Sequence, residues 1–281
     1  SQIDTRAEAV RQTVTGRYAV AIAGSHAKGT ADAQSDIDFF VYAEQPRPYE
    51  ERKRCIDSLA DAGTPRWVSP DFRDGAWGGS MDFTYQGTPV ETTVKLLEDF
   101  ESQFSRCLQG DFDIIPADWT TNGYFSYICL SEIHFVKPVA DPFHILADYK
   151  SRCAAYPPLL QRAIAERFMG RSCFWLDSFH YLSAIEREDV LFTAPIVQHI
   201  TLDLIQVVFA LHEVYFTGDK KLVSQLQRLP RCPRVFLEHI EELMSSPKDR
   251  DHLRRQREIL CQTRAALEEQ IAGLAWNMEG R

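Results

Sequence analysis

Two aspartates two positions apart follow a Gly-Ser pair in residues 24–38, which read GSHAKGTADAQSDID. The apolar run that begins between these aspartates, IDFFVYA, favours a β-strand, and side chains two residues apart on a strand share one face. Asp36 and Asp38 are therefore expected on one face, with Cα atoms about 6.5–7 Å apart. Paired carboxylates can hold Mg²⁺, and two such ions about 3.5–4 Å apart can bridge a nucleophile and a triphosphate.

The Gly-Ser pair lies at the end of another apolar run, residues 18–23, which also favours a buried strand. Gly24 lets the backbone approach a ligand closely, and N–H groups at the start of a following helix point outward. Ser25 adds a hydroxyl donor, so the pair predicts a cradle for the phosphates of a triphosphate. Lys28 is a candidate for one more phosphate contact, and simple exposure to solvent is the alternative.

The surrounding elements predict a domain that mixes strands and helices. A Gly87-Thr88 turn between two apolar runs indicates a hairpin, and the second run, PVETTVK, alternates between apolar and polar residues. The predicted strands cover residues 18–23, 37–43, 81–86, 89–95 and 135–140, and the predicted helices cover residues 50–62 and 97–108.

After about residue 148 the apolar spacing becomes helical, with breakers such as Gly170 and Pro195 between segments. The sequence thus predicts an α+β domain with a mixed set of strands and helices over residues 1–148 and a helical domain over residues 149–281. The predicted helices of this second domain cover residues 157–168, 173–188, 197–216, 221–229, 235–244 and 251–275.

Composition narrows the classes of partner. The 281 residues carry 31 Lys and Arg against 40 Asp and Glu, a net charge of −9, which disfavours binding to duplex nucleic acid. No uninterrupted apolar run reaches the roughly 20 residues that span a bilayer, and no signal peptide opens the sequence, although Ser1 is compatible with a removed leader. Seven dispersed cysteines without a C-x-x-C pair indicate reduced thiols and a cytoplasmic location. The histidines lack the spacing of zinc ligands.

The segment GSHAKGTADAQSDID resembles the signature of the DNA polymerase β-type nucleotidyltransferase superfamily, which is GS, a short helix with a Gly, then D-x-D on the next strand. The resemblance implies a polymerase β-like domain with a mixed sheet. It also implies transfer of a nucleoside monophosphate from an NTP to an acceptor, with release of pyrophosphate. Gly24 and Ser25 would hold the β- and γ-phosphates, and Asp36 and Asp38 would ligate Mg²⁺.

The superfamily also uses a third acid on a later strand beside the first two. Glu91, in PVETTVK, is the candidate, either as a metal ligand or as general base for the acceptor hydroxyl. An exposed cross-strand charge is the alternative interpretation of Glu91. Asp82, in the facing arm of the hairpin, is the second candidate for the third acid.

A catalytic domain followed by a helical bundle resembles the nucleotidyltransferases that act on aminoglycoside or lincosamide antibiotics. That resemblance implies ATP as donor, a small-molecule acceptor, and a monomer or homodimer. Lys220 and Lys221, after Gly218, would reach phosphate, and a solvated helix start is the alternative. Two other functions stay open: transfer to a tRNA or a protein side chain, as in toxin–antitoxin relatives, and nucleotide binding without catalysis.

Overall fold

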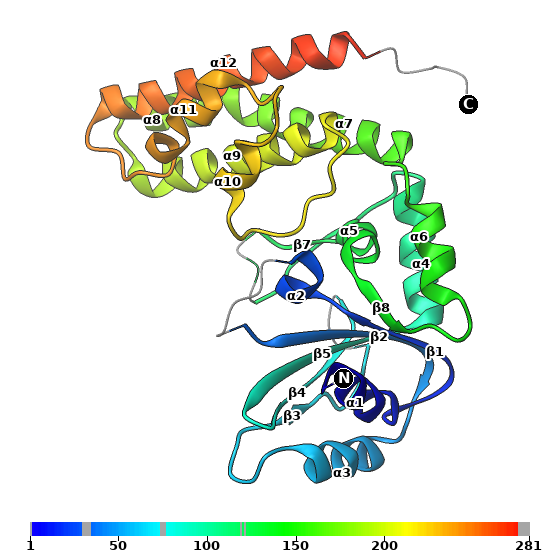
Figure 1. Ribbon diagram of the computed structural model, residues 1–281. Coiled ribbons are helices and arrows are strands. Elements are labelled where there is room, and N and C mark those ends of the chain that lie inside the picture. Colours follow the sequence, from blue (N-terminus) through cyan, green and yellow to red (C-terminus); the bar gives the residue numbers. More distant parts are fainter. Residues whose placement is uncertain (1, 30–34, 74–76, 119, 121, 275–281) are drawn as a thin grey trace. The chain divides into compact units, whose positions relative to one another are not determined.

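The structure is a computed structural model that describes residues 2–29, 35–73, 77–118, 120 and 122–274 (Figure 1). These residues form two compact units, and the chain passes from the first to the second between Ala155 and Tyr156. Gln109–Asp111, Thr120 and Asn122 also belong to the second unit. The boundary expected after residue 148 falls inside a helix of the first unit, α6 (Ile145–Arg152).

A six-stranded mixed sheet forms the centre of the first unit, with strand order β3-β4-β5-β2-β1-β8. Only β2 and β5 pair in parallel, and the other neighbouring strands are antiparallel. This confirms the predicted fold class, a mixed sheet followed by a helical part. The strands of the sheet are β1 (Val14–Ile22), β2 (Ile37–Pro46), β3 (Trp67–Val68), β4 (Gly79–Tyr85), β5 (Thr88–Leu96) and β8 (Lys137–Ala140), and a separate ribbon joins β6 (Ile114–Ile115) to β7 (Tyr124–Phe125).

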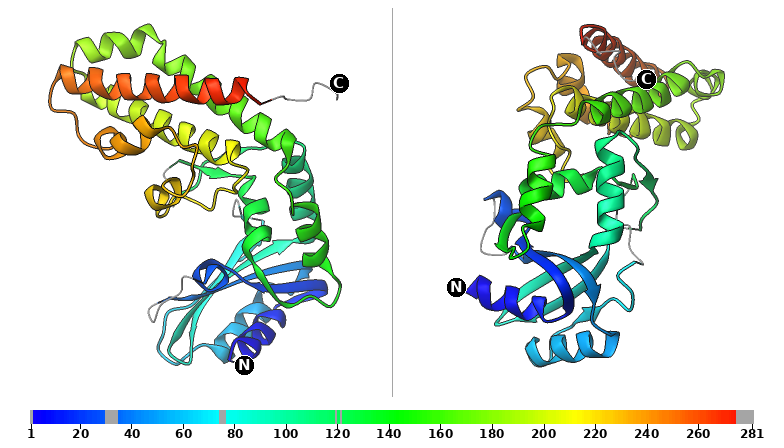
Figure 2. Two further views of the ribbon diagram at one scale, coloured as in Figure 1. Left: turned by 45° about the horizontal axis from the view of Figure 1, so that its top comes forward. Right: turned by 90° about the vertical axis from the view of Figure 1, so that its right-hand side faces the viewer.

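Helices cover the two faces of this sheet differently (Figures 1 and 2). On one face, α1 (Gln2–Arg11) and α3 (Tyr49–Leu59) pack on a continuous apolar core. On the other face, α4 (Leu97–Leu108), α5 (Ile128–Phe135) and α6 form a second layer. That layer packs over the ends of β2 and β5 near Tyr42, which contacts Phe100 of α4 edge-on. The opposite ends of the same two strands carry the candidate site.

The predicted hairpin is present, but its turn is shifted by one residue. Tyr85 pairs with Thr88, so Gln86 and Gly87 form the two-residue loop, and both have positive φ, as a type I′ turn requires. The carboxylate of Asp61 accepts hydrogen bonds from both loop N–H groups, at 2.9 and 2.7 Å. The shift places Glu91 and Asp82 directly opposite each other.

The second unit is helical, as predicted, although several helix boundaries differ from expectation. The single helix expected over 173–188 is wrong, because the chain breaks at Asp177 and Ser178. Gly170 and Pro195 were expected to interrupt helices but lie inside them. Pro195 is the sixth residue of α9, where it removes one backbone N–H donor near the start of the helix. The helices are α7 (Pro158–Leu176), α8 (Phe179–Glu186), α9 (Val190–Leu211), α10 (Leu222–Leu226), α11 (Arg234–Leu243) and α12 (Arg250–Ala272).

One helix, α9, is long and apolar enough to cross a bilayer by length and composition alone. No uninterrupted apolar run was expected there from the sequence, because His199, Asp203 and Gln206 interrupt it. Within the second unit 72% of its most apolar 18-residue window is buried, chiefly by α7 and α12. Burial of this extent is typical of the central helix of a bundle.

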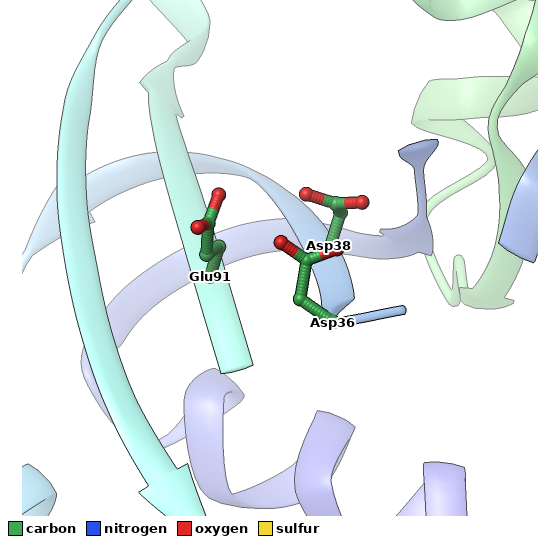
Figure 3. A group of neighbouring side chains, drawn as sticks. All are labelled: Asp36, Asp38 and Glu91. Atoms are coloured by element: carbon green, nitrogen blue, oxygen red, sulfur yellow. The ribbon is translucent and has the colours of Figure 1, made fainter. Parts of the chain in front are cut away.

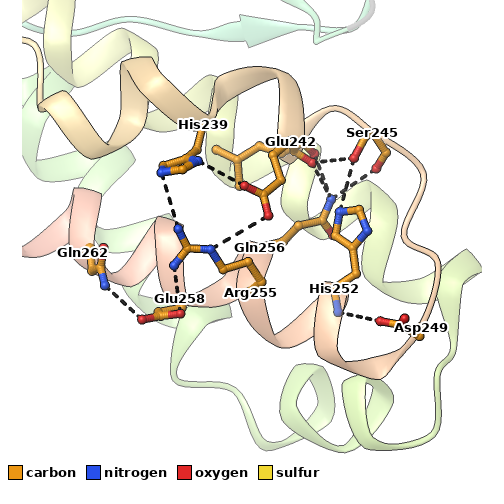
Figure 4. A network of polar contacts seen from close by, with 10 residues as sticks. His239, Glu242, Ser245, Asp249, His252, Arg255, Gln256, Glu258 and Gln262 are labelled. Atoms are coloured by element: carbon orange, nitrogen blue, oxygen red, sulfur yellow. Dashed lines mark hydrogen bonds and ion pairs between the residues drawn. The ribbon is translucent and has the colours of Figure 1, made fainter.

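Polar contacts join α11 to α12 (Figure 4). The side-chain amide of Gln256, which is buried, donates to the backbone carbonyls of Glu242, Leu243 and Ser245, where α11 ends. Asp249 accepts a hydrogen bond from the backbone N–H of His252 and so caps α12. Side chains thereby provide hydrogen-bond partners for backbone carbonyl groups at the end of α11 and for a backbone N–H group at the start of α12.

Candidate active site

Three acidic side chains of the first unit meet near the N-terminal ends of two central strands of the sheet, β2 and β5 (Figure 3). Asp36, Asp38 and Glu91 each offer a carboxylate oxygen within 4.8 Å of the others. Asp38 and Glu91 are direct partners in the parallel pairing of β2 and β5, and Asp36 lies just before the first residue of β2. The structure therefore brings together all three acids that the sequence proposed as metal ligands.

The alternation of residues along β2 explains why these acids face away from the core. Ile37 and Phe39, on either side of Asp38, are buried in the apolar cluster that α1 and α3 cover. On β5, Val90 and Thr92 are buried in the same way around Glu91. Because successive strand residues point to opposite faces, burying these neighbours directs both carboxylates to the open face.

Gly24 begins a five-residue helix, α2 (Gly24–Lys28), immediately after β1 and beside β2. It has a φ of +55°, and a β-carbon at this position would lie 1.7 Å from Oδ2 of Asp38. The backbone N–H of Ala23 donates to the carbonyl oxygen of Asp38 at 2.9 Å, which fixes the two strand ends together. Glycine at position 24 is thus required by both backbone conformation and space.

The two residues after Gly24 present polar atoms that lack protein partners. The hydroxyl of Ser25 and Nε2 of His26 are shielded from solvent and have no hydrogen-bond partner among the residues that the structure describes. A buried polar group left unpaired costs about 1–3 kcal/mol, which a ligand at this place would offset. The finding is compatible with the phosphate cradle expected at Gly24 and Ser25.

Electrostatic repulsion is concentrated at Glu91. Its pKa is raised, first by burial and then by the neighbouring carboxylates of Asp36, Asp38 and Asp82. A divalent cation would remove this repulsion, and carboxylate oxygens are the ligands that Mg²⁺ prefers. The donor set and its excess of negative charge therefore fit a magnesium site.

Asp82, the second candidate for the third acid, lies on β4 opposite Glu91. It is outside the group of three oxygens, because β5 separates its strand from β2. Burial raises its pKa, and the backbone N–H of Thr92 donates to it. The geometry thus groups Glu91, rather than Asp82, with the two aspartates.

Three lysines were expected near phosphate, and their positions in the structure leave that expectation untested. The backbone of Lys28 ends α2, and its side chain lies outside the described part of the structure. Lys220 and Lys221 are exposed residues of the second unit, and Lys221 precedes α10 with a φ of +59°. Their expected contacts with phosphate remain predictions.

One residue beside the acids escaped the sequence analysis. Trp67 of β3 pairs directly with Asp82, and its side chain is exposed. β3 has only two residues, which is too short for any alternation to be visible in the sequence. Its single neighbour in the sheet, β4, could be assigned only once the hairpin register was known.

A comparison with protein families agrees with the motif. Among solved structures, the chain is similar to a nucleotidyltransferase-like protein from Exiguobacterium sibiricum, at 9% identity and a TM-score of 0.47, covering 97% of this chain and 74% of that one. A search of curated proteins found no match. Residues 3–68 match the family described as nucleotidyltransferase domain, and this stretch holds Gly24, Asp36 and Asp38. This part of the first unit, residues 3–68, is therefore similar to nucleotidyltransferase domains.

Proposed function

We propose that the protein is a Mg²⁺-dependent nucleotidyltransferase that transfers a nucleoside monophosphate, AMP from ATP, to a hydroxyl group of a small molecule. The observation that carries this proposal is the meeting of Asp36, Asp38 and Glu91 within 4.8 Å, next to a glycine that no other residue can replace without overlap. A module that only binds nucleotides has little need of a complete set of metal-binding acids. Catalysis is therefore favoured over nucleotide binding alone.

In the proposed reaction, Asp36, Asp38 and Glu91 hold the metal, which when bound would neutralise the triphosphate and the developing charge on the leaving group. Gly24 and Ser25 hold the β- and γ-phosphates, with Lys28, Lys220 and Lys221 as further phosphate contacts. These residues align the α-phosphorus with the acceptor, and such positioning supplies most of the rate enhancement in phosphoryl transfer.

The acceptor hydroxyl approaches from the side of Glu91, the acid of the group that lies farthest along the sheet from α2. Its oxygen forms a bond to the α-phosphorus as the bond from phosphorus to the pyrophosphate oxygen breaks. The hydroxyl proton passes to a carboxylate oxygen, for which Glu91 is the candidate. The products are the nucleotidylated acceptor and pyrophosphate.

The charge of the protein bears on the class of acceptor. We favour an aminoglycoside or lincosamide antibiotic over a tRNA end or a protein side chain, because a net charge of −9 disfavours RNA. The described cysteines are free thiols, which supports a reducing cytoplasm as the place of action. The proposed partners are an NTP and a small molecule, with neither duplex nucleic acid nor a membrane, and the protein acts as a monomer or homodimer.

The direct test is release of pyrophosphate from each of the four NTPs with Mg²⁺, with and without a panel of aminoglycosides and lincosamides. Asp38→Asn removes one metal-binding charge at constant size, and Glu50→Gln on α3, behind the opposite face, is the matched control. We expect release that depends on the acceptor, disappears in Asp38→Asn and persists in Glu50→Gln. Equal release by both variants would contradict the assigned site.

Failure of the whole panel has a separate meaning. If NTP binding still depends on Mg²⁺ and on Asp38 but no small acceptor supports release, the antibiotic assignment is wrong. The same assay would then be run with tRNA and with protein acceptors. NTP binding with no turnover on any acceptor would establish the non-catalytic alternative.

A further inference from the structure

A row of directly paired side chains continues beyond the three acids. Glu91 of β5 is the neighbour of Asp38 on one side and of Asp82 on the other. On the next strand, Asp82 is paired with Trp67 of β3. Directly paired residues lie on the same face of a sheet with Cβ atoms about 4.5–5.5 Å apart. Asp82 and Trp67 therefore extend the candidate active site across two more strands.

This row lies on the face of the sheet opposite the α1 and α3 core. The residues next to it in the sequence, such as Val68, Met81 and Val90, are all buried in that core. Alternation then places Trp67, Asp82 and Glu91 on the other face. The helices of the second layer cover that face at its far end, near Lys95, so the row is accessible from the side of the acids.

Asp82 is a fourth carboxylate that the metal ligands do not account for. It lies outside the group formed by Asp36, Asp38 and Glu91. No Lys, Arg or His side chain in the described ranges forms an ion pair with it, although it is partly withdrawn from solvent. A half-buried carboxylate beside other acids is stabilised by a cation, and here that cation must come from outside the described protein groups.

Trp67 gives an independent indication of what that cation is. Its indole is 54% exposed on the edge strand of the sheet. No aromatic or basic side chain in the described part of the chain stacks on it. An exposed indole binds both apolar ring faces and organic cations, and tryptophan is the best of the aromatic residues for a cation. An indole gives a small hydrated metal ion no comparable stabilisation. A carboxylate beside an indole therefore favours an organic cation over a metal ion.

We propose that Asp82 and Trp67 bind a protonated amine of the acceptor, so that the acceptor of this enzyme is an amino alcohol rather than a neutral alcohol. The inference rests on the proposed function, because it places the accepting hydroxyl beside Glu91. The ammonium group donates hydrogen bonds to the carboxylate of Asp82, and the adjoining carbon atoms pack on the indole of Trp67.

The strand spacing also limits the shape of the acceptor. Neighbouring strands are about 4.8 Å apart, so Asp82 lies one strand beyond Glu91. The amine and the accepting hydroxyl are therefore separated by about 5 Å, which corresponds to three intervening carbon atoms in an extended chain. A neutral acceptor of the same shape would leave Asp82 without a counter-charge and should be selected against.

Binding of amine probes tests the inference without any turnover. The full chain is titrated calorimetrically with kanamycin, neomycin and glucosamine, each beside its fully N-acetylated form, which keeps the hydroxyls and removes the positive charge. We expect at least one amine to bind 10-fold or more tightly than its acetylated form. Asp82→Asn should abolish that preference, and Glu50→Gln, which removes the same charge from the opposite side of the sheet, should preserve it.

The indole is tested by a pair of variants that keep the strand intact. Trp67→Ala should weaken binding of the amine at least 5-fold, and Trp67→Phe should restore most of it. Absence of binding by all three amines, or a preference that survives Asp82→Asn, would overturn the inference. Circular dichroism of each variant excludes misfolding as the cause of a loss.

Turnover separates this inference from the proposed function. If amines bind through Asp82 but no acceptor supports release of pyrophosphate, the proposed function fails and the amine site stands. If an amine acceptor and its neutral N-acetylated form are nucleotidylated with equal KM, and Asp82→Asn leaves both KM values unchanged, the function stands and the amine site is wrong. Support for both requires Asp82→Asn to raise the KM for amine acceptors about 10-fold, with kcat and the KM for the NTP nearly unchanged.

Discussion

A β-carbon on Gly24 would lie 1.7 Å from Oδ2 of Asp38, so the end of β1 is packed directly against a proposed metal ligand. The φ of Gly24, +55°, is also one that residues with a side chain rarely adopt. The contact joins the phosphate-binding and metal-binding parts of the proposed site. A side chain at position 24 should therefore displace the carboxylate of Asp38.

Gly24→Ala should abolish most activity while leaving the protein folded. The added methyl group must displace the Asp38 carboxylate or the backbone of α2, and a misplacement of about 1 Å can lower a rate by about 100-fold. We expect a loss of at least that size in pyrophosphate release, together with weaker Mn²⁺ binding. Gly29→Ala is the matched control, because Gly29 has a φ of +70° but none of the atoms that the structure describes would lie within 4 Å of its β-carbon. Equal losses in the two variants would show that backbone strain, and not overlap with Asp38, is responsible.

Several features of the site were predictable because they depend on local patterns. The apolar residues around Asp38 determine a strand and its buried face, and the D-x-D spacing follows from the period of that strand. The parallel neighbour of β2 is not a local feature. Glu91 and Asp82 are opposite each other in one hairpin, so both are compatible with the sequence, and only the pairing of β5 with β2 distinguishes them.

Other features were missed because their signal in the sequence is weak or misleading. Residues 173–188 have continuous helical spacing, yet the chain turns at Asp177 and Ser178 so that Tyr181 can be buried in the bundle. Trp67 stands in a strand of two residues, where no periodicity exists. Both depend on packing between segments far apart in the chain, which propensity and spacing do not encode.

Removing Lys95 should destabilise the first unit more than removing an ordinary surface lysine. Its ammonium forms an ion pair of 2.9 Å with Glu132 and donates to the carbonyl oxygen of Trp77, while its side chain is only 4% exposed. Lys95→Met leaves the Glu132 carboxylate, which is 14% exposed, without its counter-charge. A cost of about 3–5 kcal/mol in the free energy of unfolding is expected from breaking a buried pair on one side.

A double-mutant cycle shows whether that cost comes from the unpaired charge. Glu132→Gln alone should also destabilise, whereas Lys95→Met combined with Glu132→Gln should cost clearly less than the two single changes added together. Urea denaturation of the four proteins at pH 7 measures the coupling. Strict additivity would mean that the ion pair contributes nothing beyond the packing of its two side chains.

The final prediction concerns the pH dependence of stability and depends on Glu101 of α4. Two hydrogen bonds from Arg152, at 2.8 and 2.9 Å, lower the pKa of Glu101 to about 2. A carboxyl group with a lowered pKa in the folded protein stabilises it above the unfolded pKa, and this contribution is lost as the pH falls toward the folded pKa. The side chain of Glu101 is 45% exposed, so water screens the pair, and its contribution is about 1 kcal/mol at neutral pH.

Glu101→Gln should therefore be about 1 kcal/mol less stable than the unchanged protein at pH 7, and this difference should shrink steadily between about pH 4.5 and pH 2. Urea denaturation at a series of pH values measures it. Glu166→Gln, which breaks the single contact of a helix-surface pair with Arg162, is the control and should cost at most about 0.5 kcal/mol. A difference for Glu101→Gln that stays constant down to pH 2 would mean that lost packing, rather than the Arg152 ion pair, explains the destabilisation, because only the ion pair depends on the charge that protonation removes.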